Sequence, residues 1–132
     1  MPVALDARSL GDHFPGIGRY VKNLAQEIGP RLTGEESLIL LTRENISCRW
    51  DLKPFLGERV TLAQASASPF SLSQQWEIPS LLHKAGADLY HSPYYLMPYF
   101  AGVRTILTIH DLIPLHFHCF SIDEETSLEC IP

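Results

Sequence analysis

The chain has 132 residues, of which 45% are apolar and 19% are charged. This length fits one domain, and this composition can bury a core, so an intrinsically disordered chain is excluded. The formal net charge of -5 argues against nucleic-acid binding, which needs a broad surface of Lys and Arg.

The N-terminal residues and the cysteines favour a cytoplasmic protein. Residues 1–8 show no basic segment followed by a long apolar one, so no signal peptide is predicted. Every apolar run is shorter than the ~20 residues that span a bilayer, so we expect no transmembrane segment. The three cysteines, Cys48, Cys119 and Cys130, lack C-x-x-C spacing and are interpreted as reduced thiols.

The first part of the chain predicts a strand, a loop and a helix. Residues 3–5 form a short apolar strand that ends at Asp6, and a polar loop fills residues 7–15. From Gly16 onward, apolar residues recur every three or four positions, which places them on one helix face. This predicted core face consists of Ile17, Tyr20, Val21, Leu24 and Ile28. Gly29-Pro30 is expected to end the helix.

Four more strands are predicted further along the chain. The continuous apolar run at 37–42 is typical of a strand buried on both faces, and residues 59–63 are a weaker candidate. Residues 88–91 and 104–109 are the fourth and fifth strands. The segment 43–58 shows no clear period.

A second helical region is indicated between the third and fourth strands. Its apolar residues are Leu72, Trp76, Leu81 and Leu82. Pro79 lies within this stretch, so we expect either a kink or two abutting helices with Pro79 in a first turn.

Strands that alternate with helices predict an α/β fold: a Rossmann-like, doubly wound parallel sheet with right-handed crossovers. The apolar rhythm stops after Pro114. We therefore expect one domain over residues 1–118 and an irregular, truncated tail over residues 119–132.

Polar residues follow three of the predicted strands. In an open parallel sheet, ligands bind beyond the carboxyl ends of the strands, near the point where the strand order reverses. If strands one, four and five are neighbours, these polar residues share one cleft. They are Asp6 and Arg8, then His91, Ser92 and Tyr94, and finally His110 and Asp111. In the alternative interpretation, the aspartates only cap turns and the histidines are satisfied loop residues.

Gly16, Gly18, Arg19 and Tyr20 open the first helix. Glycines at a helix start let backbone N–H groups approach a phosphate, although they could equally form only a tight turn. The dinucleotide pattern G-x-G-x-x-G is not met, because Val21 stands where the third glycine would be. We therefore expect no nicotinamide or flavin cofactor.

The densest polar cluster contains His110, Asp111, His116 and His118. A histidine at a strand end can hydrogen-bond a sugar hydroxyl or transfer a proton near pH 7. His116 and His118 with Cys119 could instead hold a metal, but their spacing fits no standard zinc site, so no metal is predicted. No Gly-x-Ser-x-Gly elbow is present, which argues against a serine nucleophile.

An aromatic group follows His91 and consists of Tyr94, Tyr95, Tyr99 and Phe100. It suits sugar stacking or an apolar acceptor, although such groups are more often core or interface.

Several of these motifs, in this order, resemble the N-terminal domain of family-4 glycosyltransferases of the GT-B fold, in the mannosyltransferase-like branch. They are Leu-Asp-Ala-Arg and Gly-Ile-Gly-Arg-Tyr within residues 3–20, the stretches 69–82 and 87–94, and Thr-Ile-His-Asp-Leu-Ile-Pro at 108–114. The resemblance covers residues 1 to about 120.

The resemblance implies one half of a retaining enzyme that uses no metal. Its N-terminal domain binds a sugar or lipid-linked acceptor, and a C-terminal domain holds a nucleotide-sugar donor through an E-x7-E pair. Gly16 and Gly18 would approach the donor phosphates and the acceptor. His110 would face the transferred sugar, with Asp111 as its catalytic neighbour.

This sequence departs from the family pattern at its C-terminal end. It contains no second domain, and the adjacent Glu124 and Glu125 do not supply the E-x7-E spacing. We therefore expect the chain to be inactive alone, so whether it is itself an enzyme stays open. The alternative is a non-enzymatic α/β module for binding or self-association. A homo-oligomer is expected through the aromatic group or the edge of the fifth strand.

Overall fold

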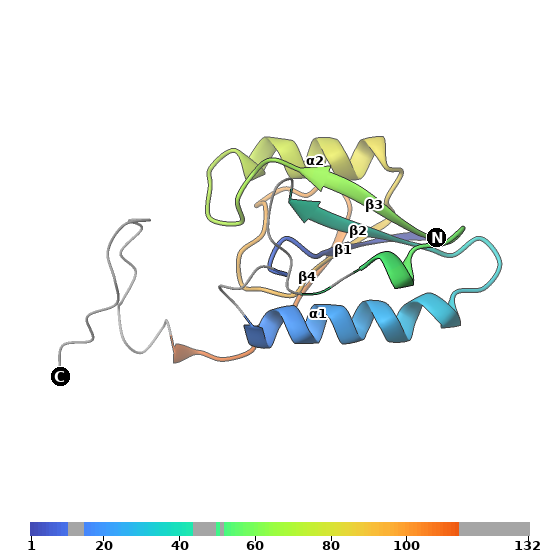
Figure 1. Ribbon diagram of the computed structural model, residues 1–132. Helices are drawn as coiled ribbons and strands as arrows, with labels where there is room; N and C mark the ends of the chain where they lie inside the picture. The colour runs from blue at the N-terminus through green and yellow to red at the C-terminus, as the bar shows by residue number, and fades with distance from the viewer. Residues whose placement is uncertain (11–14, 44–49, 51, 114–132) are drawn as a thin grey trace.

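The computed structural model describes residues 1–10, 15–43, 50 and 52–113 (Figure 1). Five parallel strands form one sheet in the order β3-β2-β1-β4-β5. They are β1 (Pro2–Asp6), β2 (Ser37–Arg43), β3 (Val60–Ala65), β4 (Leu89–Ser92) and β5 (Arg104–Leu107). This arrangement confirms the predicted Rossmann-like fold, including the expected neighbourhood of strands one, four and five.

Two helices cover opposite faces of the sheet (Figure 1). They are α1 (Pro15–Ile28) and α2 (Gln74–Lys84), and short 3-10 turns lie at Gly29–Arg31 and Lys53–Phe55. No helix in the described part of the chain is long and apolar enough to cross a membrane. The tail at 119–132 and the candidate metal ligands His116, His118 and Cys119 lie outside the described residues.

The predicted helix α1 is confirmed, but its core face is rotated from the expected one. Gly18, Val21 and Ala25 are its buried residues, whereas Ile17 and Leu24 are only half-buried. Val21 and Ala25 pack in the cluster between α1 and the sheet, whereas Gly18 is buried against Trp50 and the backbone of Ser9. The larger apolar side chains then pack along the margins of the contact with Leu5, Leu38 and Leu40.

The prediction of which residues of α2 pack against the core is partly wrong. Its buried face consists of Gln74, Ile78 and Leu82, which are spaced four residues apart. Leu72 and Trp76 are exposed instead. Trp76 lies two positions from both Gln74 and Ile78, which points it away from the sheet.

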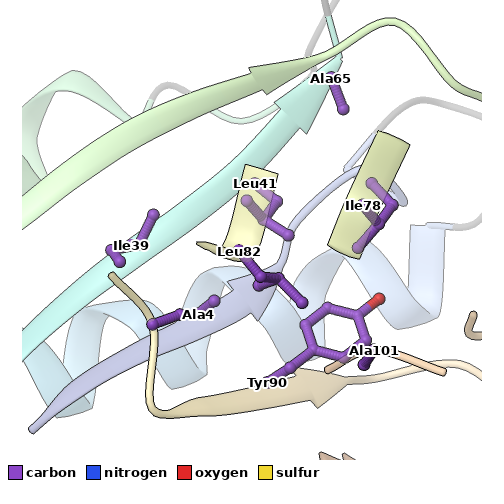
Figure 2. Packing of buried hydrophobic residues seen from close by; sticks show 9 residues of the cluster. Ala4, Ile39, Leu41, Ala65, Ile78, Leu82, Tyr90 and Ala101 are labelled. Carbon is purple, nitrogen blue, oxygen red and sulfur yellow. The ribbon is translucent and has the colours of Figure 1, made fainter. Parts of the chain in front are cut away.

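Pro79 lies inside α2, so the alternative of two abutting helices is wrong. Figure 2 shows the core under this helix, where Ile78 and Leu82 point toward Tyr90 of β4.

The strands differ in how much of each face is covered. In β2, Leu38 and Leu40 belong to the cluster under α1, and Ile39 and Leu41 to the cluster under α2. This confirms the expectation of a strand buried on both faces. In contrast, β5 is a sheet edge that exposes both Ile106 and Leu107, and it ends before Ile109.

The two glycines at the start of α1 should respond differently to substitution. A Cβ at Gly16 would meet nothing within 4 Å, whereas one at Gly18 would lie 3.1 Å from Nε1 of Trp50. Gly16→Ala should therefore raise the free energy of unfolding by roughly 0.4–1 kcal/mol, because alanine restricts the unfolded chain. Gly18→Ala should instead lower the free energy of unfolding by about 1 kcal/mol relative to the wild type, because the new Cβ would crowd Trp50. Urea denaturation of both variants measures this difference, and equal stability would contradict the packing of Gly18.

Candidate functional site

The candidate site lies at the carboxyl ends of β1, β4 and β5. The strand order reverses between β1 and β4, because the chain adds β2 and β3 on one side of β1 and then β4 and β5 on the other. Ligands of open α/β sheets bind at such a point. The predicted site residues lie at the ends of these strands, in the loops that follow them and at the start of α1.

A cluster of three rings brings together predicted residues from three elements. Tyr20 of α1 lies edge-on to His110, with ring centroids 5.2 Å apart, and edge-on to His91, with centroids 6.4 Å apart. His91 lies in β4, and His110 follows β5. We call Tyr20, His91 and His110 the His–Tyr cluster. It shows that the glycine motif and the two histidine motifs meet in space.

The hydrogen bond of His110 decides which ring nitrogen is available to a ligand. Its Nε2 lies 2.9 Å from the carbonyl oxygen of Pro93, which can only accept a hydrogen bond. Nε2 therefore carries the proton, and in the neutral ring Nδ1 has the free lone pair. Because His110 is exposed, a ligand hydroxyl can reach it.

Asp111 is exposed, and its Oδ1 accepts a hydrogen bond from the backbone N–H of Ile113 at 3.0 Å. This is the turn-stabilising role that the alternative interpretation gave to it. A catalytic role for Asp111 stays a prediction.

Asp6 and Arg8 have a different position from the one expected of ligand-binding residues. Both are buried, and Nη2 of Arg8 lies 2.6 Å from Oδ2 of Asp6. The hydroxyl of Tyr90 donates to the same carboxylate oxygen at 2.6 Å. Burial and the nearby carboxylate raise the pKa of Tyr90, so its hydroxyl remains a donor at neutral pH. We call Asp6, Arg8 and Tyr90 the buried network.

Arg8 also joins β1 to the segment before α2. Its Nη1 donates to the carbonyl oxygen of Ala67 at 3.2 Å, and its Nη2 donates to Oε1 of Gln74 at 3.2 Å. The buried network therefore positions the loop that follows β3. The sequence analysis did not predict the roles of Tyr90 and Gln74. The signal that could have indicated Tyr90 was a tyrosine within one buried strand and an aspartate at the end of another.

The remaining residues of the glycine motif differ in their exposure to solvent. Gly16 and Arg19 are exposed at the start of α1, whereas Gly18 is buried under Trp50. Contact of Gly16, Gly18 and Arg19 with a phosphate stays a prediction, and the missing side chain of Gly18 leaves room for Trp50.

Tyr94 lies among other aromatic rings rather than alone at the sheet edge. Its hydroxyl donates to the hydroxyl of Tyr95 at 2.7 Å, and its ring lies edge-on to Phe70 with centroids 5.8 Å apart. Burial first, and the bond to Tyr95 second, raise the pKa of Tyr94. Ser92, also expected near the cleft, is buried and donates to the carbonyl oxygens of Tyr94 and Leu96. It thereby shapes the loop after β4.

The hollows of the described surface are small at this site and larger elsewhere. A cavity of about 10 Å³ lies between Asp6, Ser9, Phe70 and Tyr94. That volume suits one water molecule and not a sugar ring. A wider hollow of about 440 Å³ lies beside the C-terminal end of α1, toward Arg59. We place the site at the carboxyl edge because the polar rings converge there.

Among the described residues, no group of three or more His, Cys, Asp or Glu side chains could hold a metal ion.

The pH dependence of stability should report the burial of His91. Burial lowers the pKa of His91 below its ordinary value of 6.5. The unfolded chain then binds a proton at a higher pH than the folded chain does, so stability falls as the pH drops through 6.5 and is unaffected above it. We expect His91→Gln to lose less stability than the wild type between about pH 7 and pH 5. Urea denaturation at both pH values measures the free energy of unfolding, and equal losses in the variant and the wild type would contradict the prediction.

Comparison with protein-family models, curated proteins and solved structures finds no match to this chain.

Proposed function

We propose that the chain is the acceptor-side domain of a retaining glycosyltransferase of the GT-B kind, in the mannosyltransferase-like branch of family 4. The observation that carries the proposal is the ring contact between Tyr20 and His110. The two residues belong to separate motifs that resemble the glycine loop and the His-Asp loop of that family. Their meeting at the carboxyl edge of the sheet favours one shared sugar site.

The chemistry of the His–Tyr cluster suits a hydroxyl-rich ligand. Nδ1 of His110 can accept a hydrogen bond from a sugar hydroxyl, because Nε2 is held by Pro93. The half-buried ring of Tyr20 lies beside His110 and can contribute an apolar surface for a hexose. In this proposal, the partners of the complete enzyme are a nucleotide-sugar donor and a sugar or lipid-linked acceptor.

Ligand binding tests the proposal directly. Saturation-transfer NMR with a panel of methyl hexosides should show transfer from the protein to at least one hexoside. The signal should be lost in Tyr20→Ala and in His110→Ala. Tyr99→Ala is the matched control, because it removes an exposed ring outside the His–Tyr cluster. Absence of any hexoside signal, or loss only in the control, would overturn the proposed site.

The chain by itself should not transfer sugar at a measurable rate. Retaining transfer needs the leaving phosphate to be stabilised, and this electrostatic contribution is usually the largest catalytic one. In the proposal, that contribution belongs to a donor domain. Turnover of a nucleotide sugar by the 132-residue chain, abolished by His110→Ala, would therefore overturn the assignment of an acceptor half.

The genomic reading frame supplies an independent test. A second Rossmann-like domain with an E-x7-E pair, encoded after the codon for Pro132, would support the glycosyltransferase. A stop codon at that point would favour the second candidate, a module for binding or self-association. That candidate is favoured by the exposure of Trp76, Tyr99 and Phe100.

A further inference from the structure

Large apolar side chains are exposed around the N-terminal end of α2. Tyr99 and Phe100 are 84% and 88% exposed, and Leu72 and Trp76 are 79% and 71% exposed. Phe70 is 46% exposed. We call these five residues the aromatic surface. Single exposed apolar residues are normal in soluble proteins, but a group of this kind marks an interaction site.

A contact within the protein brings the segment that carries Tyr99 and Phe100 against α2. The backbone N–H of Tyr99 donates to Oε1 of Gln75 at 2.8 Å, which fixes the loop after β4 against α2. Turn hydrogen bonds from Gln75 to Leu72 continue the helical path before α2. Leu72 and Trp76 are four residues apart and so share one side of that path.

The aromatic surface is almost free of charge. Residues 66–76 and 92–103, which supply it, contain no Asp, Glu, Lys or Arg. Glu77 follows directly, but its carboxylate accepts hydrogen bonds from the backbone N–H groups of Ser66 and Ala67. Depletion of charge with enrichment in Trp, Tyr and Phe is the composition of an interface core.

The area of the aromatic surface matches one side of a stable interface. A fully covered aromatic side chain buries about 150–250 Å². Scaled by their exposed fractions, and with Leu72 added, the four aromatic side chains of this group expose roughly 600–800 Å². A standard interface removes about 800 Å² per partner from water. The surface is therefore large enough to carry a specific protein contact.

We infer that the aromatic surface is the contact between two copies of this chain, related by a two-fold axis. Each copy carries a net charge of -5, so like charges would oppose most contacts between copies. A two-fold contact sets a surface against itself, and this surface brings no charge to that contact.

Sedimentation equilibrium over a roughly hundredfold range of micromolar concentration tests the inference. The wild type should be a dimer at the upper end of this range. The double variant Trp76→Ser with Phe100→Ser should weaken dimerisation at least tenfold. Both positions are exposed, so circular dichroism should show an unchanged fold.

Ile106→Ser is the matched control, because it removes an exposed apolar side chain from the edge strand β5. It should leave the dimer intact. A wild type that stays monomeric throughout would overturn the inference. A dimer that survives the double variant but is lost in Ile106→Ser would also overturn it, and would place the contact on β5.

Discussion

Val21→Asp should lower the free energy of unfolding by about 3–5 kcal/mol, the range for an unpaired buried charge. Val21 is fully buried at the centre of the contact between α1 and the sheet. The new carboxylate would lose its hydration without gaining a partner. Guanidinium denaturation measures the loss, and a variant already unfolded without denaturant also meets the expectation because domains are only marginally stable.

Asn23→Asp is the matched control for this substitution. It adds the same charge to the same helix at an exposed position, two residues away. Its stability should stay within about 0.5 kcal/mol of the wild type. Equal losses in the two variants would show that the charge of α1, and not burial at Val21, determines the effect.

Arg8→Met should have a comparably large effect, with a loss of about 3–5 kcal/mol. The substitution leaves the buried carboxylate of Asp6 without its cation, although the hydrogen bond from Tyr90 remains. It also removes the donors to Ala67 and Gln74, which hold the loop after β3. Chemical denaturation gives the free energy, and a loss below about 1 kcal/mol would contradict the buried network.

Asp6→Asn combined with Arg8→Met separates the charge from the packing. Removing both charges avoids an uncompensated ion, so the double variant should recover at least about 1 kcal/mol relative to Arg8→Met. The amide oxygen of Asn can still accept from Tyr90. Strictly additive losses in the double-mutant cycle would show that Asp6 and Arg8 are not coupled.

The fold class was predictable from the sequence because parallel sheets leave a simple pattern. A strand covered on both faces, such as β2, reads as a continuous apolar run. A helix that packs on one side, such as α1, reads as an apolar period of three and four. The alternation of these two patterns then restricts the topology to a few arrangements.

The exact faces of the helices were not predictable in the same way. Gly18 and Ala25 belong to the buried face of α1 together with Val21, but small residues carry little weight in an apolar pattern. Trp76 suggested a core position, although it lies on the side of α2 away from its buried residues Gln74 and Ile78. An apolar residue alone does not say whether it faces core or solvent.

The strand ends that meet at the carboxyl edge were predictable, but the contacts of their side chains were not. The sequence places Asp6 and Arg8 at a strand end, yet their burial depends on Ala67, Gln74 and Tyr90. These partners are distant in the sequence, and no local pattern connects them. The ring contact between Tyr20 and His110 depends in the same way on the strand order.

The all-parallel sheet has a consequence for how the chain folds. Val3 of the central strand pairs with both Leu38 and Leu89. Among the five strands of this sheet, no two neighbours are joined by a tight hairpin. Each pairing therefore requires a long loop to close before its hydrogen bonds form. Topologies dominated by such distant contacts fold slowly, and apolar strands stay uncovered while they do. For this chain, yield on expression should thus depend on the speed of folding as well as on the stability of the finished domain.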